Sequence, residues 1–257
     1  MNFLKKIPVA FILLSLAIFA FIPSGCAARR APAALETARR NILVEFSRID
    51  LELKRAAERI GTAGLTGDGA RATLEDLVKA LPYAVDVAAI DSTGKMVTIE
   101  PAAYRHFEGS DISDQEQVKR ILDRRMPVMS AVFRTVEGLE ATDVEYPVFG
   151  SGGAFLGSVS LLFSSEKLLD AALVPSAGGK SSIWVMETGG RILSHPEKSR
   201  IGTNFLAWDR LRAEEKLRRL AERFASEGEG RDAGRGAIWT TASLYDTAWR
   251  LIVFGWE

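Results

Sequence analysis

The stretch of sequence that decides the fold occurs twice in the chain. Val87-Ala88-Ala89-Ile90-Asp91-Ser92-Thr93-Gly94-Lys95-Met96-Val97 aligns without a gap with Ile183-Trp184-Val185-Met186-Glu187-Thr188-Gly189-Gly190-Arg191-Ile192-Leu193. Each copy has four apolar residues, an acid, a hydroxyl, a spacer, a glycine, a base and two apolar residues, the pattern of a β-hairpin. Any two hairpins can share turn chemistry. Because the match continues into the strands that follow, we predict a duplicated module.

Each hairpin is followed by a loop, a helix and further strands. In the first half the predicted helix spans residues 114–125, and strands are predicted at 126–135, 142–149 and 155–163. In the second half the helix spans 207–226, after a loop at 195–204, and the strands are 236–244 and 247–255. A helix at 164–173 and a linker at 175–180 join the two halves.

Upstream of both modules the period of the sequence is helical. Apolar residues recur at spacings of three and four over 35–61, which predicts a long amphipathic helix, and a second helix at 72–81 ends before Pro82. The predicted fold class is therefore α+β, with a long N-terminal helix before two tandem modules that contain antiparallel sheets.

The N-terminus has the features of an export signal. Lys5 and Lys6 precede an apolar run at 7–22, and Pro23-Ser24-Gly25-Cys26-Ala27 follows it. Ser24-Gly25-Cys26 resembles the end of a bacterial lipobox, in which Cys26 would be lipidated, although Pro23 departs from that motif. The alternative is an uncleaved anchor with an incidental cysteine. Cys26 is the only cysteine, so no intrachain disulfide can form.

Composition and missing motifs argue against several classes of protein. Lys plus Arg and Asp plus Glu both number 33, so no net positive field would attract nucleic acid. The only two histidines, His106 and His195, have no second ligand at metal-site spacing. Gly179-Lys180-Ser181 lacks the first glycine of a phosphate loop, because Val174 stands there. We expect no metal, no cofactor and no enzyme; a hydrolase that uses Asp or Glu is a weaker alternative.

Three features together resemble a known family. They are the long helix before two modules, the Gly-Ser-Asp-Ile-Ser-Asp stretch at 109–114, and the second-module stretches at 190–196 and 201–204. From residue 35 to the C-terminus the chain resembles the double Cache sensor domains. These PAS-like domains lie outside the membrane in bacterial and archaeal chemoreceptors and histidine kinases.

The resemblance implies an anchored, extracytoplasmic sensor. Its expected parts are a signal peptide with lipobox at 1–26, an N-terminal helical stalk at 33–81, a membrane-distal Cache module that binds the ligand at 82–174, and a membrane-proximal Cache-like module at 175–257. The ligand would be an amino acid, an amine or a carboxylate. Since Glu257 closely follows the last strand, we expect the domain to act through a separate membrane receptor or kinase. The alternative is a structural or assembly lipoprotein that binds only proteins.

The loop before the first predicted helix holds most of the candidate ligand contacts. In the amino-acid-binding branch of the family a Tyr, Arg, Trp and Tyr series is completed by an Asp. Tyr104 and Arg105 fit this series, whereas the Trp and the later Tyr are missing. Arg105 can hold a carboxylate by two parallel hydrogen bonds, or it can be a solvated loop arginine. The full candidate set is Tyr104, Arg105, His106, Asp111, Ser113, Asp114, Ser130, Phe133, Asp143 and Tyr146.

Other roles for these residues compete with ligand binding. Ser113 or Asp114 can cap the following helix. Alternation places Asp143 and Glu145 on one strand face and Tyr146 on the other, and exposed carboxylates are the simpler interpretation of the first pair. The sequence leaves open which face lines a pocket. The tryptophans, including Trp184, Trp239, Trp249 and Trp256, are expected to fill cores.

Overall fold

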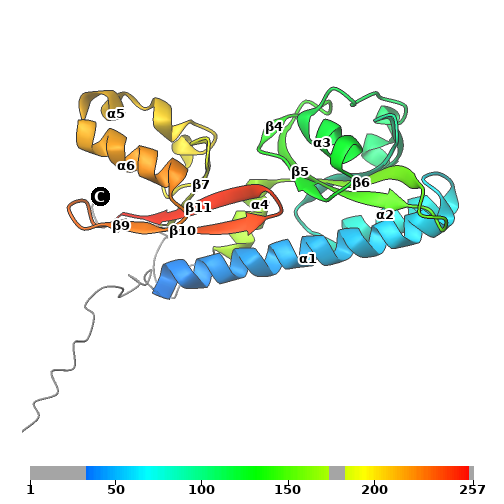
Figure 1. The fold of residues 1–257 in the computed structure, drawn as a ribbon, viewed down its shortest axis with the longest axis horizontal. Helices are drawn as coiled ribbons and strands as arrows, with labels where there is room; N and C mark the ends of the chain where they lie inside the picture. The colour runs from blue at the N-terminus through cyan, green and yellow to red at the C-terminus, as the bar shows by residue number, and fades with distance from the viewer. Residues whose placement is uncertain (1–32, 174–182, 255–257) are drawn as a thin grey trace, which may run out of the picture. The chain divides into compact units, whose positions relative to one another are not determined.

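The chain forms two separate antiparallel sheets that share one long helix (Figure 1). The computed structural model describes residues 33–173 and 183–254. The predictions of a signal peptide, of lipidation at Cys26, of the linker at 175–180 and of a core role for Trp256 fall outside these residues.

The α-helices are α1 (Ala33–Ala63), α2 (Asp68–Ala80), α3 (Glu116–Arg124), α4 (Ser165–Ala172), α5 (Asp209–Ala213) and α6 (Glu215–Ser226). Short 3-10 helices are η1 (Ala102–Phe107), η2 (Lys198–Arg200) and η3 (Phe205–Ala207).

The first sheet has the strand order β2-β1-β6-β5-β3, with β4 paired to β5, and the second has the order β8-β7-β11-β10-β9. The strands of the first are β1 (Ala84–Asp91), β2 (Met96–Glu100), β3 (Val128–Met129), β4 (Phe133–Arg134), β5 (Glu140–Phe149) and β6 (Phe155–Phe163). Those of the second are β7 (Ile183–Glu187), β8 (Ile192–Ser194), β9 (Gly230–Asp232), β10 (Ala237–Leu244) and β11 (Thr247–Val253). The prediction of two tandem modules is confirmed.

The duplicated turn has the same hydrogen bonds in both copies. Gly94 N–H donates to the Asp91 carbonyl at 3.0 Å, and Gly190 N–H donates to the Glu187 carbonyl at 2.9 Å. Gly94 and Gly190 have φ angles of 86° and 89°, a left-handed conformation that favours glycine. The turn chemistry that the sequence repeats is therefore what sets the geometry of both hairpins.

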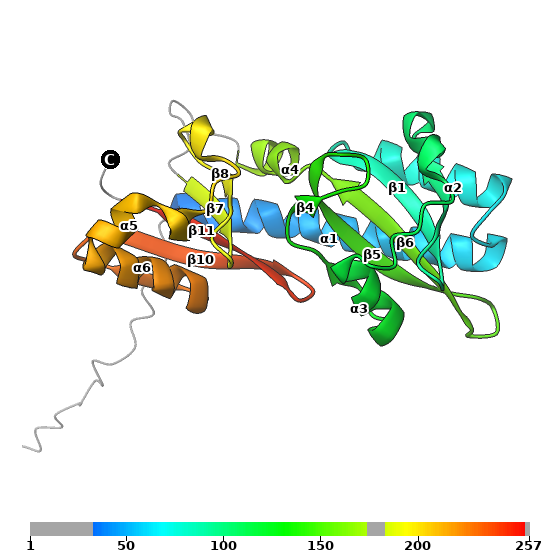
Figure 2. The ribbon, with the colours of Figure 1, turned by 90° about the horizontal axis from the view of Figure 1, so that it is seen from above.

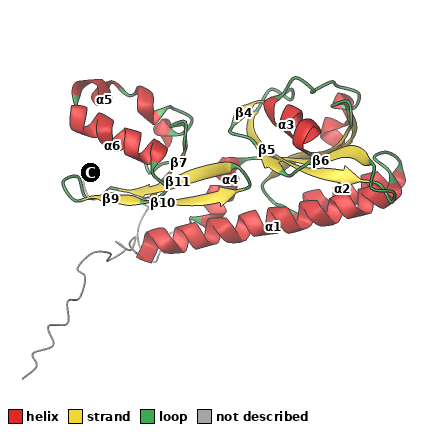
Figure 3. Cartoon of the chain, viewed as in Figure 1, coloured by secondary structure: helices red, strands yellow, loops and turns green. Residues whose placement is uncertain are grey.

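One face of α1 lies on both sheets (Figure 3). Its buried side chains recur at helical spacing: Leu35, Ala38, Ile42, Phe46, Ile49, Leu53, Ala56, Ala57 and Ile60. The Phe46 ring packs on the edge of Trp249 in the second sheet at 4.9 Å, and Trp249 in turn lies 6.5 Å from Phe163 in the first. Burial of each such aromatic side chain contributes about 1.5–3 kcal/mol. Residues 33–63 thus belong to the core that joins the modules.

The structure corrects the sequence-based elements at several points. The strand predicted at 126–135 is two short strands, because at Val132 the backbone N–H turns away from β5 and donates to the carboxylate of Glu187. The helix predicted at 207–226 breaks at Glu214, whose backbone is extended and whose carboxylate binds Arg210 and Arg235. Strand β9 was not predicted.

The predicted side-chain cap of α3 is also wrong. The N-terminal cap position is Gln115 and no side chain caps the helix. Instead, the Asp111 carboxylate accepts the N–H of Ser113 at 3.0 Å. In the second module Asn204 accepts the N–H of Leu206 in the same way, at 2.9 Å. This short side-chain turn is therefore part of the duplicated fold.

Candidate functional site

The face of the first sheet that points away from α1 carries an unusual set of polar side chains. Asp143 and Glu145 on β5, Ser158 and Ser160 on β6, and Asp86 on β1 occupy alternate positions and are all buried. The intervening residues Val87, Val144 and Val159 belong to the apolar core on the α1 side. Figure 2 shows α3 and β4 on the side of this sheet that faces away from α1. The interpretation of Asp143 and Glu145 as exposed carboxylates is therefore wrong.

A narrow cavity lies between this face and the segment around β4. Its lining consists of Asp86, Ala88, Met96, Ile112, Gln115, Phe133, Thr135, Val136, Glu137, Asp143, Ser160 and Leu162. The cavity measures about 20 Å³, which is room for one water molecule. Three carboxyl groups contribute to the wall, and the rest is mostly apolar.

Hydroxyl and amide donors hold Asp143 of this wall and the neighbouring Glu145, which is buried on the same sheet face but does not line the cavity. Asp143 accepts from the Ser160 hydroxyl at 2.6 Å and from the Gln117 amide at 3.1 Å. Glu145 accepts from the Ser158 hydroxyl at 2.6 Å. Among the described residues, Glu145 Oε1 and Asp86 Oδ2 are buried and have no hydrogen-bond partner. The fixed acceptors are therefore only partly satisfied.

Burial raises the pKa values of these acids. Desolvation, with added repulsion from Glu137 and Asp143, raises the pKa of Asp86 to about 8. Desolvation likewise raises the pKa of Asp143 to about 6, against the opposing hydrogen bonds from Ser160 and Gln117. The pKa of Glu145 is well above its ordinary value, because the group is desolvated and lies beside Asp143.

No positive side chain neutralises the cluster. Within residues 33–173 and 183–254, no salt bridge involves Asp86, Asp143 or Glu145, and the cavity lining contains no Lys, Arg or His. The nearest basic influence on Glu145 comes from Arg120, whose guanidinium binds Asp246 at 2.5 Å and the Met129 carbonyl at 2.8 Å. A buried carboxylate without a counter-charge is costly, so the site can bind a cation that supplies hydrogen-bond donors.

Arg105 and its neighbours lie beside this cavity and do not line it. Arg105 binds Glu100 at 2.5 Å and Glu75 at 3.5 Å, and Glu100 also binds Arg71 at 2.7 Å. These ion pairs tie η1 to α2 and to the end of β2. Tyr104 packs against the small apolar cluster that includes Ala88, Met96 and Ile112, whereas His106 stacks on Phe107 with ring centres 4.1 Å apart.

The other candidate residues fall into two groups. Phe133 and Asp143 line the cavity, and the buried Ser130 supports it by accepting the N–H of Asp143 at 2.9 Å. Tyr146 packs against the α1-side core on the opposite face, and Asp111, Ser113 and Asp114 do not line the cavity. The ligand roles of these ten residues stay predictions.

Sequence reasoning missed Asp86, Gln117, Glu137, Ser158 and Ser160. For three of them, the alternation of polar and apolar residues along the strands gave a signal. Asp86 alternates with Val85 and Val87, and Ser158 and Ser160 alternate with Val159 and Leu161 in otherwise apolar runs. A strand buried on both faces has little reason to place acids or hydroxyls on one of them unless that face is functional.

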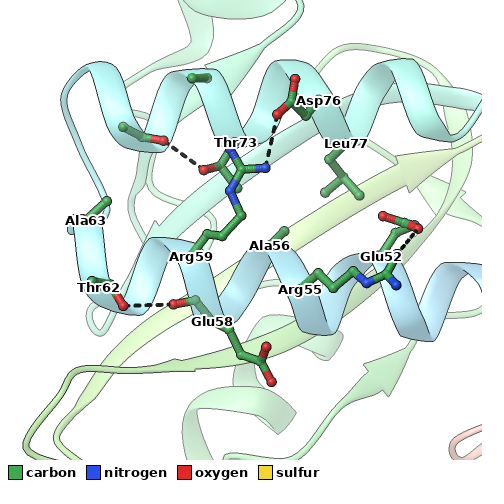
Figure 4. A pocket seen from close by; sticks show the side chains of 12 residues that line it. Glu52, Arg55, Ala56, Glu58, Arg59, Thr62, Ala63, Thr73, Asp76 and Leu77 are labelled. Atoms are coloured by element: carbon green, nitrogen blue, oxygen red, sulfur yellow. Dashed lines mark hydrogen bonds and ion pairs between the residues drawn. The ribbon is translucent and has the colours of Figure 1, made fainter.

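A second hollow lies between α1 and α2 (Figure 4). Ion pairs cross or border it, including Arg59 with Asp76 and Arg55 with Glu52, both at 3.0 Å. All four side chains are partly or largely solvent-exposed, and exposed pairs of this kind contribute little. This groove lacks the buried, unpaired groups of the acidic cavity.

The described residues contain neither a membrane-spanning helix nor a cluster of metal ligands. None of the helices among residues 33–173 and 183–254 has both the length and the apolar character needed to cross a membrane. The same residues contain no group of three or more His, Cys, Asp or Glu side chains arranged to hold a metal ion.

Comparisons with known proteins agree with this architecture. Residues 44–165 match the family model described as HK/GC/chemotaxis protein-like, sensor domain. A search of curated protein sequences found no match. An extracellular ligand binding receptor from Desulfohalobium retbaense is 30% identical, with a TM-score of 0.74. The alignment covers 88% of this chain and 40% of the receptor chain, so this chain spans less than half of that receptor.

Two chemoreceptor domains share the fold at lower identity. The ligand-binding domain of chemoreceptor CtaA from Pseudomonas fluorescens, in complex with L-serine, is 18% identical with a TM-score of 0.59; 85% of this chain and 92% of that chain are covered. The ligand-binding domain of PctC from Pseudomonas aeruginosa PAO1, in complex with GABA, is 18% identical with a TM-score of 0.57; 86% and 95% are covered. The chain therefore has the fold of the Cache-type ligand-binding domains, and its residues 44–165 match the sensor-domain family model.

Proposed function

We propose that the chain is the extracytoplasmic ligand-binding domain of a sensor, and that its first module binds a small molecule with an ammonium group. The observation that carries this proposal is the cavity lined by Asp86, Glu137 and Asp143, with no cationic side chain in its lining. An ammonium group would pair with the ionised acids of this lining and donate to the unsatisfied oxygen of Asp86. CtaA and PctC, which share the fold, are described with L-serine and GABA, two molecules that contain an amine.

The same cavity disfavours a ligand with a free carboxylate at its centre. The lining has three carboxyl groups and no cationic side chain, so nothing in it would pair with an anion, and Arg105 is paired with Glu100 outside the cavity. The remaining walls, which include Phe133, Met96, Ile112 and Leu162, suit an apolar substituent. Within the predicted class of amino acids, amines and carboxylates, the geometry therefore favours a simple amine.

Binding requires the cavity to open, since about 20 Å³ cannot hold more than a water molecule. The wall most able to move is the β4–β5 hairpin, which supplies Phe133, Thr135, Val136 and Glu137. Its turn depends on only a few backbone hydrogen bonds, such as Thr135 N–H to the Leu139 carbonyl at 2.9 Å. We infer that an amine binds as this hairpin lifts and then stabilises a loaded form. Signalling through a separate membrane receptor or kinase stays a prediction.

A thermal-shift measurement tests the proposed function. We expect n-butylamine, putrescine or phenethylamine to raise the melting temperature of the chain, while n-butanol and butyrate do not. A ligand at about 100 times its dissociation constant stabilises the folded state by about 2.7 kcal/mol, which corresponds to several degrees for a chain of this size. Asp143→Asn should abolish the shift, because it keeps the shape of the side chain and removes its charge.

The matched control is Asp76→Asn, which removes an exposed carboxylate on α2 and should leave the amine-induced shift intact. A shift with butyrate and none with the amines would contradict the ammonium specificity. If amines, amino acids, carboxylates and purines all leave the melting temperature unchanged, the sensor function fails and the structural lipoprotein is favoured.

A further inference from the structure

The second module has a cavity at the position equivalent to the acidic one, with different chemistry. It measures about 670 Å³, and its lining includes Trp184, Glu197, Arg200, Phe205, Trp208 and Phe254. In the aligned repeat Trp184 matches Ala88, which lines the first cavity. Phe205 N–H donates to the Gly190 carbonyl just as Ile112 N–H donates to the Gly94 carbonyl, so these two lining residues also correspond. The duplication thus retains a cavity on the same face of the second sheet.

The walls of this second cavity are aromatic. Trp184 lies 4.5 Å from Phe254, 5.8 Å from Phe205 and 5.9 Å from Trp208, measured between ring centres. Trp208 and Phe205 are 5.1 Å apart in an edge-to-face arrangement. A volume of this size suits a small molecule, and ring walls favour a planar aromatic one. The first cavity, with its three acids, offers no such surface.

Arg200 gives the cavity a site for an anion. Its guanidinium lies over the Trp208 ring at 4.3 Å, and its Nε donates to Glu197 at 3.1 Å. Neither terminal nitrogen of Arg200 has a hydrogen-bond partner among the described residues. The stacked and anchored guanidinium therefore presents its two-nitrogen edge, the geometry that binds a carboxylate through two parallel bonds.

Two more observations favour an anion over a cation. One donor in the lining residues has no acceptor, because the Trp184 indole Nε1 is buried and unpaired among residues 33–173 and 183–254. Glu197, the acid in the lining, already accepts from Ser199 at 2.8 Å and from Arg200, and these bonds lower its pKa. Its charge is therefore balanced by Arg200, and the lining offers no unpaired acid for an ammonium group, which an aromatic cage alone would bind.

We propose that the second module is a separate binding site for a planar aromatic carboxylate, with its ring packed against the aromatic wall that includes Trp184 and Trp208 and its carboxylate on Arg200. This site is distinct from the amine site in the first module and does not rest on it. The chain would then bind two ligands of opposite charge, one in each copy of the duplicated module.

Calorimetric titration of the full chain tests this second site. The probe is indole-3-acetate, and indole-3-acetamide and tryptamine are its neutral and cationic analogues. We expect indole-3-acetate to bind at least tenfold more tightly than either analogue. Arg200→Gln should weaken its binding about tenfold or more, since a charge-assisted pair is lost, and Trp208→Ala should weaken it as well. Arg200→Lys keeps the charge but lacks the two-nitrogen edge, so its affinity for indole-3-acetate should lie between those of wild type and Arg200→Gln.

Two control variants separate this site from general effects. Arg218→Gln removes an exposed arginine of α6, which pairs with Glu222 within the same helix, and should bind indole-3-acetate like the wild type. Asp143→Asn should also leave this binding unchanged, whether or not the amine site exists. Equal affinity of wild type and Arg200→Gln, preference for tryptamine, or absence of binding at millimolar indole-3-acetate would each overturn the proposal.

Discussion

The most informative single residue of the first module is Asp86. Its carboxyl group is buried, one oxygen has no partner among the described residues, and desolvation together with Glu137 and Asp143 raises its pKa to about 8. Such a group reduces the stability of the folded chain unless something binds to it. Groups of this kind gather at functional sites, where binding requires them.

The raised pKa predicts the direction in which stability changes with pH. An unfolded Asp86 loses its proton near pH 4, whereas the folded one keeps it until about pH 8. The folded state therefore holds more protons in this window, and its stability falls as pH rises from about 4 to 8. We expect Asp86→Asn to be about 1–3 kcal/mol more stable than wild type at pH 8. The difference should shrink toward pH 4, as measured by denaturant unfolding.

Asp76→Asn is again the control, because Asp76 is exposed and its replacement should change little at either pH. A wild-type chain that gains stability from pH 5 to pH 8 relative to Asp86→Asn would contradict the assignment. So would an Asp86→Asn variant that is less stable than wild type at pH 8.

At the scale of elements, the wall of the acidic cavity is bonded directly to the second module. Val132 N–H, between β3 and β4, donates to Glu187 Oε1 at 2.6 Å, and the Thr247 hydroxyl donates to the Met129 carbonyl at 2.6 Å. Arg120 of α3 binds Asp246 in the β10–β11 turn. The hydrogen bond that interrupts the expected strand thus also connects the wall of the acidic cavity to the repeated hairpin of the other sheet.

This connection predicts that a ligand in the first cavity changes the stability of hydrogen bonds in the second module. We expect a bound amine to slow amide hydrogen exchange in residues 183–194 and 244–249, because ordering of the β4–β5 hairpin strengthens its contacts there. Glu187→Ala should reduce that protection in 183–194 without abolishing protection at β4. Glu222→Ala, on the exposed face of α6, should behave like wild type. Equal protection in wild type and Glu187→Ala would mean that the contact does not transmit the change.

For the whole molecule, local sequence signals predicted the architecture well. The repeated hairpin, the succession of strands along the chain and the long amphipathic helix depend on turn chemistry and period, which a few adjacent residues express. The errors arose where tertiary contacts outweigh local preference. The backbone N–H of Val132 donates to Glu187, which interrupts the predicted strand, and the extended backbone of Glu214 divides the predicted helix.

The site was harder to predict than the fold. The sequence pattern pointed to Arg105, but Glu100, a neighbour in the fold, engages its guanidinium outside the cavity. Asp143 was named as a candidate while its burial was not expected, since a carboxylate on a strand is usually exposed. Which strand face is covered depends on how α1 and the segment around β4 pack on the sheet. No short stretch of sequence contains that information.

The central claim is that an ammonium group binds the acids of the first cavity, and proton release on binding tests it most directly. At pH 7 an empty Asp86, with a pKa of about 8, is mostly protonated, and an ammonium group beside it should expel that proton. Calorimetry of n-butylamine binding in buffers of different ionisation enthalpy should therefore show release of up to about one proton at pH 7, and almost none at pH 9.5. Binding that releases no proton at pH 7, or that persists unchanged in Asp143→Asn, would contradict the account.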